Sequence, residues 1–489
     1  MINTKHILAL LLAALLLSTS MTACGGSNTE KITQENDAAE TPEETMPETT
    51  DIDLLPDANY EGFDSHILST DPACLWGYMV SIYAEEETGE PLNDFVFQRN
   101  LAIEDRYNIT ISNTADKDSV PTSAEAKQLA LAGDDTYSIV SYGVRWQLLD
   151  AVSGCFINLH TIETIDFSHP WWGSEAGNML TIQDKLYVGF TEMNVFDYET
   201  LTGIYVNNDM IENHNLESPY DMVRKGTWTM DAMYDMAVTA VQDLDGNGSI
   251  SEGDVLGYAG GVGCFNVMMT AANQPHVLLG DDGKYTLNHG TEASIAAAEK
   301  ITRLINDNTV TGYQNDQPWV GEAFGKGNAL FYGSGLAVLS QVRDSEVSVG
   351  IVPEPKFDEQ QTGYRTMYSS QCMTIAVPVS NGDPERTGVI CEALGAYSRL
   401  PLKKVYYESI LKRKAARDEE TMEMLDIIVN NKYVDIGVLN YDTWGDIIFD
   451  YTEAMRNSGT EQLVSTAAAN HSKFYVTLKS IEDAYAKNP

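Results

Sequence analysis

The hydrophobic pattern of the chain beyond residue 60 predicts alternating strands and helices. Short apolar runs of strand length occupy residues 65–70 (SHILST), 108–112 (NITIS) and 137–142 (YSIVSY). Between them, the spacing predicts a helix over 91–107 and a shorter one over 124–132. The order strand, helix, strand, helix, strand is typical of a parallel α/β sheet.

The same rhythm continues through the second half of the chain. Further strands are expected at 185–190, 204–207, 329–332 and 347–351. Thr229 is a good N-cap for a helix over 230–241, and residues 291–305 form a cleanly amphipathic helix. Asp383 and Pro384 begin a helix that is expected to end near Leu400, and the last ninety or so residues read as largely helical. No repeat of fixed period is visible.

The N-terminal pattern indicates export. Lys5 and His6 precede the apolar run ILALLLAALLL at 7–17, which is too short to span a bilayer of about 20 helical residues. Small residues then lead to Cys24, as in a bacterial lipobox, so residues 1–23 are expected to be a lipoprotein signal peptide and Cys24 its lipidated cysteine. The alternative is an ordinary secretory signal with a chance cysteine. In either case the mature protein works outside the cytoplasm, here at the extracellular face of the cell membrane.

Composition narrows the class of protein. Residues 24–58 are polar, acidic and poor in aromatics, and are expected to form a disordered tether. The formal net charge of −42, from 30 basic and 72 acidic residues, argues against nucleic-acid binding. The six cysteines are scattered, and without Cys24 five remain, so we expect buried thiols rather than a disulfide framework.

Residues 243–254 (DLDGNGSISEGD) have the spacing of a calcium loop. Oxygen-bearing residues stand at positions one, three, five, seven, nine and twelve, and Gly248 stands sixth. The predicted ligands are Asp243, Asp245, Asn247, Ser249, Ser251 and Asp254. The last position holds Asp where EF-hands have Glu, and no second copy of the loop occurs. The sequence therefore predicts a structural Ca²⁺ site, with a polar turn that binds no metal as the alternative.

Several stretches, in this order, resemble the extracellular solute-binding lipoproteins of bacterial ABC importers, of the family 1-like, sugar-binding type. The stretches are NLAIEDRYNITIS, HPWWGSEAGNMLTIQDKLYVGF (169–190), TGIYVNNDMIENHNLESPYD with KGTWTMDAM (202–233), GNALFYGSG (327–335), VGIVPEPK (349–356) and YESILKRKAARDEETMEMLDII. The resemblance implies a two-lobed α/β fold of the periplasmic-binding-protein kind (type II), with hinge crossovers and the calcium-like loop inserted in the second lobe. It also implies lobe 1 at 59–190 plus about 335–380, and lobe 2 at about 191–334 plus 381–489.

The same resemblance implies a monomer that traps a small molecule in its cleft and delivers it to the permease subunits of an ABC transporter, without catalysis. The ligand is expected to be a carbohydrate, and more specifically an oligosaccharide, because sugar rings stack on flat aromatic side chains. Trp171 and Trp172 are the sharpest candidates, since adjacent tryptophans after a proline are hard to bury together. Weaker candidates, each also explicable as core, are Trp76, Tyr142, Trp146, Trp319, Tyr332 and Tyr368. The polar candidates are Asp71, Arg145, Glu192 and Gln371.

Two other functions stay open at this point. A glycosidase needs only two carboxylates, so the pattern of acids does not exclude a secreted carbohydrate-active hydrolase. No GxSxG, HExxH, Walker or GxGxxG motif is present, however, so we expect no enzyme. The second alternative is a peptide-binding receptor of the same fold.

Overall fold

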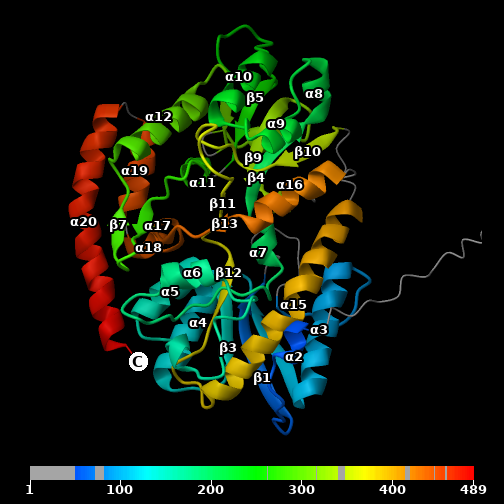
Figure 1. The fold of residues 1–489 in the computed structure, drawn as a ribbon, viewed down its shortest axis with the longest axis vertical. Helices are drawn as coiled ribbons and strands as arrows, with labels where there is room; N and C mark the ends of the chain where they lie inside the picture. The colour runs from blue at the N-terminus through cyan, green and yellow to red at the C-terminus, as the bar shows by residue number, and fades with distance from the viewer. Residues whose placement is uncertain are drawn as a thin grey trace, which may run out of the picture. The chain divides into compact units, whose positions relative to one another are not determined.

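The computed structural model describes residues 50–71, 82–261, 263–314, 317–339, 347–412, 419–444, 446–457 and 460–488. The predicted signal peptide, Cys24 and Trp76 lie outside these residues. Two sheets organise the described chain, as Figure 1 shows. We call each sheet, with the helices packed on it, the first and the second lobe.

The first sheet has the strand order β12–β3–β1–β2. Its strands are β1 (Phe63–Thr70), β2 (Ile109–Asp116), β3 (Ile139–Gly143) and β12 (Met373–Ala376). Strand β1 pairs in parallel with both β2 and β3, which confirms the predicted parallel α/β arrangement. Strand β12 arrives from much later in the chain and runs antiparallel to β3. The connecting helices are α3 (Pro91–Tyr107), α4 (Ser119–Ala132) and α5 (Val144–Val152).

The second sheet is mixed, with the order β10–β4–β9–β5–β8. Its strands are β4 (Thr202–Asn207), β5 (Leu256–Gly260), β8 (Thr311–Tyr313), β9 (Ala329–Gly335) and β10 (Val349–Val352). Strand β4 is antiparallel to β9 and β10, and β5 is parallel to β8 and β9. Helix α10 (Met230–Ala240) begins as predicted, because the Thr229 side chain accepts a hydrogen bond from the Ala232 amide.

The strand expected at 185–190 does not form. This segment makes only isolated bridges, between Ile182 and Lys185 and between Gly189 and Ile375. The backbone of Leu186 instead bonds to the Asn158 side chain and to the Leu159 amide. Its apolar side chains are buried, and within the described residues its backbone bonds to a strand at Gly189 alone, whose amide and carbonyl pair with Ile375 of β12.

The C-terminal part is helical, as expected. It contains α15 (Pro384–Lys412), α16 (Glu419–Asn430), α17 (Ile436–Leu439), α18 (Tyr441–Trp444), α19 (Asp446–Asn457) and α20 (Thr460–Lys487). Helix α15 continues past Pro401, beyond the predicted end, because Leu402 and Tyr406 extend its buried face. It packs on α3 of the first lobe, whereas the predicted boundaries assign residues 381–489 to the second lobe. Helix α20 contacts α5, α12 and α19 (Figure 1).

The folded body begins earlier than the predicted tether allows. Helix α2 (Thr50–Asp53) packs on α15, where Asp51 accepts a hydrogen bond of 2.8 Å from Arg399. Leu55 is buried in the core. Residues 50–58 are therefore part of the first lobe and not of a disordered linker.

The remaining elements are short or connect the lobes. They are η2 (Leu159–Thr161), α6 (Ser174–Leu180), α7 (Phe196–Glu199), α8 (Asn208–Asn213), α9 (Pro219–Lys225), α11 (Cys264–Ala271), β6 (Val277–Leu279), β7 (Tyr285–Leu287), α12 (Glu292–Asn306), α13 (Val320–Ala323), η3 (Leu336–Val338), β11 (Thr366–Met367) and β13 (Lys432–Tyr433). Strands β11 and β13 form a parallel pair that belongs to neither large sheet.

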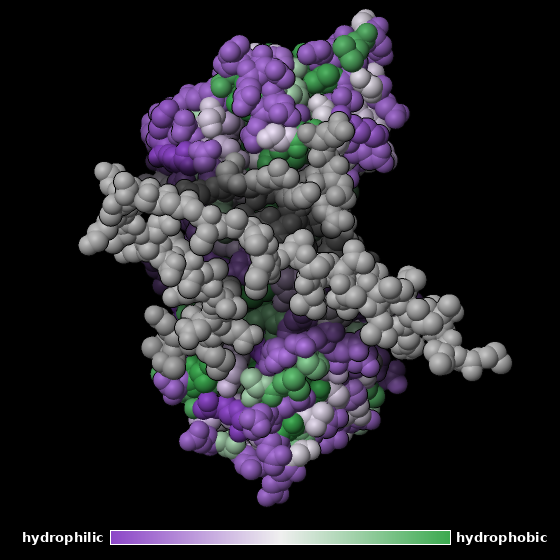
Figure 2. Space-filling view, turned by 90° about the vertical axis from the view of Figure 1, so that its right-hand side faces the viewer, coloured by the Kyte–Doolittle hydropathy of each residue, from purple (hydrophilic) through white to green (hydrophobic). Residues whose placement is uncertain are grey.

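The described surface drawn in Figure 2 is mostly hydrophilic and the described cysteines are free, as the composition predicts. Hydrophilic residues cover most of the described surface on the face drawn in Figure 2, and the hydrophobic ones form small separate patches. The four cysteines within the described ranges, Cys155, Cys264, Cys372 and Cys391, are free and buried, as predicted. Among the helices of the described residues, none is long and apolar enough to cross a membrane.

Candidate functional site

A cavity of about 480 Å³ opens between residues of the two lobes. Ser369, Ser370 and Gln371 line it from the segment that leads into β12 of the first sheet. The second lobe contributes side chains from β5, β9, α11 and the turn after β10, namely Tyr258, Tyr332, Asn266 and Glu354. We refer to this cavity as the cleft.

Four polar atoms of the cleft residues are buried and have no hydrogen-bond partner within the described parts of the chain, and one of them is the hydroxyl of Thr202 at the start of β4. The other three are the hydroxyl of Tyr258, Oε2 of Glu354 and Oε1 of Gln371. Buried polar atoms are almost always hydrogen-bonded in folded proteins, because leaving one unpaired costs about 1–3 kcal/mol. Since all four residues line one cavity, a polar molecule in the cleft would complete their hydrogen bonding.

The backbone around Glu354 is held firmly. The Trp228 indole donates a hydrogen bond of 2.8 Å to the carbonyl of Pro353, and the amide of Lys356 donates to the carbonyl of Trp228. Glu354 itself is only 2% exposed. Burial raises the pKa of its carboxyl to about 8, so the group is largely protonated at neutral pH.

Charge further limits what the cleft can hold. Among the described residues that line it, none is Lys, Arg or His, and Glu354 is the only carboxylic acid. An anionic ligand would find no cation to compensate its desolvation there. Hydroxyls, amides and tyrosine rings make up most of the polar lining.

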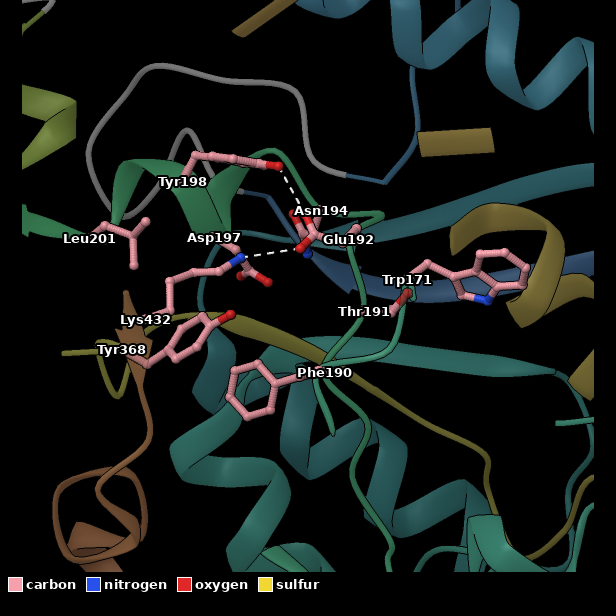
Figure 3. A pocket seen from close by; sticks show the side chains of 11 residues that line it. Trp171, Phe190, Thr191, Glu192, Asn194, Asp197, Tyr198, Leu201, Tyr368 and Lys432 are labelled. Atoms are coloured by element: carbon pink, nitrogen blue, oxygen red, sulfur yellow. Dashed lines mark hydrogen bonds and ion pairs between the residues drawn. The ribbon is translucent and has the colours of Figure 1, made fainter. Parts of the chain in front are cut away.

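A second, much smaller cavity of about 20 Å³ lies where three chain segments meet (Figure 3). Segment 190–201 supplies Glu192, Asp197 and Tyr198, the β11 segment supplies Tyr368, and β13 supplies Lys432. The Lys432 ammonium lies 3.2 Å from Glu192 Oε1, and the Tyr198 hydroxyl donates to Glu192 Oε2 at 2.8 Å. Polar contacts thus join the segments that pass between the two sheets.

Asp197 in this cluster is buried and accepts a hydrogen bond of 2.9 Å from the Met373 amide. Burial raises the pKa of its carboxyl well above the usual value, although the nearby Lys432 charge opposes this. We call Glu192, Asp197, Tyr198, Tyr368 and Lys432 the crossing cluster.

The structure corrects the expectation that Trp171 or Trp172 offers a stacking surface to a ligand. Their exposed fractions are 0% and 4%. Both indole N–H groups donate to the buried carboxylate of Glu392 on α15, at 2.8 Å each. Gly395 leaves room for Trp171, since a Cβ there would lie 2.5 Å from the indole Cδ1. Only Trp171 reaches a cavity, the small one, and both rings belong to the core of the first lobe.

The other predicted residues are distributed as follows. Tyr332 and Gln371 line the cleft, while Glu192 and Tyr368 line the small cavity. Tyr142 is buried and donates a 2.7 Å hydrogen bond to Asp150. Trp146 is half-buried beneath Arg145, which is paired with Asp442, and Trp319 precedes α13. Asp71 lies at the end of β1 and does not line either cavity.

Sequence reasoning missed Tyr258, Asn266 and Glu354. A signal exists for Glu354, which stands alone between two prolines directly after an apolar strand. An acid in that position is a poor choice for a core and is better explained by a site. Tyr258 and Asn266 have no comparable local signal, because the pairing of β5 and the packing of α11 bring them to the cleft.

The loop 243–254 closes on itself between α10 and β5. Gln242 and Val255 pair across its base, and Ile250 points inward with 5% exposure. Carboxylate oxygens of Asp243, Asp245 and Asp254 lie within 4.8 Å of one another. Gly248 has φ of 84°, a left-handed conformation that favours glycine.

Solved structures with a similar fold include bacterial solute-binding proteins. An ABC substrate-binding protein from Listeria monocytogenes, in complex with cycloalternan, matches at a TM-score of 0.55 and 12% identity, over 86% of this chain and 99% of its own. UspC of M. tuberculosis matches at a TM-score of 0.55 and 15% identity, over 84% of this chain and 100% of its own. A family 1 extracellular solute-binding protein from Bifidobacterium longum subsp. infantis matches at a TM-score of 0.52 and 13% identity, over 85% of this chain and 100% of its own.

No protein-family model and no curated protein matches the sequence. The structural matches nevertheless cover most of each chain, so this protein has the two-lobed fold of solute-binding proteins of ABC importers. The two-lobed α/β fold implied by the resemblance in the sequence is confirmed.

Proposed function

We propose that this protein is an extracellular solute-binding protein that takes a neutral carbohydrate into the cleft between its lobes and delivers it to an ABC importer. One observation carries the proposal. Tyr258, Glu354 and Gln371, whose hydroxyl, Oε2 and Oε1 are unpaired, line one cavity to which both lobes contribute. A ligand that bonds to both lobes favours their closed arrangement by those contacts.

The composition of the cleft favours a sugar over a peptide. A free peptide carries a carboxylate, which requires a cation or a cluster of amides to replace its hydration. The described lining offers no basic side chain. Tyr332 supplies a half-polar aromatic face, and the hydroxyl and amide groups suit the rim of a saccharide. Two of the structural neighbours were solved with cycloalternan and mannotriose.

The hydrolase alternative has less support. Retaining and inverting glycosidases use two carboxyl groups that flank the scissile bond. Within the described lining of the cleft, Glu354 is a single carboxyl group. We therefore propose a binding protein and expect it to return glycans unchanged.

The experiment measures the affinity of the wild type and of Tyr258→Phe for mannotriose, a neutral trisaccharide. The substitution removes one hydroxyl and keeps the ring, so affinity should fall about five- to twentyfold, as for one lost hydrogen bond of about 1–1.8 kcal/mol. Tyr475→Phe, which alters a half-exposed ring on α20, is the matched control. Equal affinities of Tyr258→Phe and wild type would show that the sugar does not bind in the cleft.

We further propose that the protein is tethered to the membrane by lipid on Cys24 and acts as a monomer. The lipobox-like sequence before Cys24 supports the anchor. The test is detergent partitioning of Cys24→Ser, which should release the protein into the aqueous phase. Retention of the variant in the detergent phase would contradict the anchor.

We also propose that the loop 243–254 holds a structural Ca²⁺ ion. The convergence of Asp243, Asp245 and Asp254 supports it, as do the oxygen-bearing residues Asn247, Ser249 and Ser251 at the spacing that hard cations prefer. The loop leads into β5, which carries Tyr258, but no residue of 243–254 lines the cleft. The ion would therefore stabilise the second lobe without taking part in ligand binding.

A further inference from the structure

A chain of hydrogen bonds leads from the cleft into the core of the second lobe. Asn266 lines the cleft, and its Oδ1 lies 3.0 Å from His276 Nε2. His276 Nδ1 in turn lies 2.9 Å from His289 Nε2. Both imidazoles are buried, with exposed fractions of 0% and 1%. Two histidines and one cleft amide thus form a single line of polar atoms.

Both rings are neutral under ordinary conditions. Burial lowers the pKa of His276 to about 4, and burial together with His276 and His471 holds the pKa of His289 well below its usual value. A neutral imidazole carries one N–H and one bare nitrogen. The line therefore has only two consistent directions for its protons.

In the first direction, His289 Nε2–H donates to His276 Nδ1, and His276 Nε2–H donates to Asn266 Oδ1. In the second, both histidines carry the proton on Nδ1, and the Asn266 amide is turned so that its nitrogen donates to His276. The two directions differ in whether His289 Nδ1, the ring nitrogen outside the line, carries a proton. That nitrogen is buried and has no partner within the described residues.

The state of His289 Nδ1 favours the first direction. There it is a bare lone pair, whereas in the second it is a buried N–H without an acceptor, which is the rarer and more costly defect. The Thr452 hydroxyl lies 3.0 Å from Asn266 Oδ1 and 2.9 Å from the carbonyl of Ile448. Because it has a single proton, it can donate to one of them or accept from a turned Asn266 amide, so Thr452 fits both directions.

We propose that the His289–His276 pair fixes the Asn266 side chain with its oxygen inward and its NH₂ group toward the cleft. Asn266 is then a hydrogen-bond donor, and His276 and His289 are positioning residues. The role of that donor rests on the proposed function. A donor beside Tyr258 and Glu354 selects ligands that present an acceptor oxygen, such as the ring or hydroxyl oxygens of a saccharide.

The surroundings keep the pair in place. Asp435 accepts the His276 amide, the His471 ring lies 2.9 Å from the carbonyl of His289, and the Tyr451 ring stacks on His289 at 3.8 Å. Asp435, His471 and Tyr451 are the titratable groups that meet the pair from neighbouring elements. Their contacts are to the His276 amide, the His289 carbonyl and the face of the His289 ring, and none involves a ring nitrogen of the pair. These contacts therefore do not fix which way the protons of the two rings point.

The first test needs no ligand. Nuclear magnetic resonance of the full chain with ¹⁵N-labelled histidine at pH 7 reports which ring nitrogen carries the proton. Signals are assigned with His276→Gln and His289→Gln, and exposed His160 serves as an internal reference. We expect the Nε2–H tautomer at both His276 and His289. An Nδ1–H tautomer at either ring would overturn the proposal.

The second measurement follows the Asn266 side-chain amide of the wild type, assigned by its loss in Asn266→Asp. Its protons should exchange rapidly with water, because they face the cleft. Strong protection would show that they are bonded to His276 instead. With mannotriose as the probe, Asn266→Asp should bind at least tenfold more weakly, since a carboxylate does not donate. Unchanged affinity would overturn the donor role, whereas a wild type that binds no neutral sugar would contradict the proposed function and leave the tautomer result standing.

Discussion

The ammonium nitrogen of Lys432 lies 3.2 Å from Oε1 of Glu192, although 240 residues separate the two along the chain. The pair connects β13 with the segment that leads from the first sheet to β4. Lys432 also lies 5.6 Å from the ring centres of Tyr198 and Tyr368. A single cation therefore links the three segments of the crossing cluster.

Lys432→Met should destabilise the protein by about 1–3 kcal/mol, because it leaves the half-buried Glu192 without its cation. Urea denaturation measures the change. Lys479→Met, which breaks the exposed pair with Asp483 on α20, is the control and should cost less than about 1 kcal/mol. Equal losses in the two variants would mean that the crossing cluster has no special part in stability.

Glu392→Gln should destabilise the first lobe by about 2–4 kcal/mol, since the new amide group faces N–H donors where the carboxylate accepted them. Oε1 of Glu392 accepts from Trp172 and the Asp166 amide, and Oε2 accepts from Trp171 and His169, at 2.8 Å each. Thermal melting measures the loss, with the exposed Glu408→Gln of the same helix as control. Ligand affinity should not change. A Glu392→Gln protein that is as stable as the wild type but binds ligand more weakly would instead show that Trp171 and Trp172 take part in binding.

Glu354 should make stability depend on pH. The pKa of its carboxyl is 4.5 in the unfolded chain and about 8 in the folded one, so the folded state binds the proton more tightly. The stability that comes from this tighter proton binding is fully present below pH 4.5 and is lost as the pH rises to about 8. The free energy of unfolding should fall more between pH 5 and pH 8 for the wild type than for Glu354→Gln. Exposed Glu359→Gln should behave as the wild type, and parallel pH profiles of Glu354→Gln and wild type would contradict the protonated state.

Chelation should lower the melting temperature if the loop 243–254 binds Ca²⁺. An ion present at 100 times its dissociation constant stabilises the folded state by about 2.7 kcal/mol. Asp243→Ala should melt at the lower temperature with or without chelator, while Asp235→Ala, on the exposed side of α10, should keep the response. A wild type that melts identically with calcium and with chelator would rule out the site.

The local elements of this fold follow from short-range chemistry. Residues 91–107 form the predicted helix because Glu90 caps its first turn and Asn108 ends it in a left-handed conformation. Residues 185–190 show the limit of such reasoning, since their apolar pattern is that of a strand but they meet β12 at one bridge, between Gly189 and Ile375. Periodicity reports burial, and the pairing partner depends on the tertiary structure.

The site was harder to predict for the same reason. The burial of both Trp171 and Trp172 depends on one carboxylate more than 200 residues later, Glu392. That residue is the only acid in the apolar stretch VICEALGAY, a signal that becomes informative only when its partners are known. The cleft residues come from separate strands and turns, so their meeting depends on the pairing of β5 with β9 and on the crossing segments.

Calorimetric titration of the wild type decides whether the cleft binds a neutral carbohydrate. The ligands are a neutral oligosaccharide series, matched oligosaccharides that carry a carboxylate, and short peptides. We expect heat of binding and compaction in small-angle scattering with at least one neutral sugar, and neither with its anionic counterpart or with the peptides. Binding of a peptide or an anionic sugar, with no neutral sugar bound, would contradict the account.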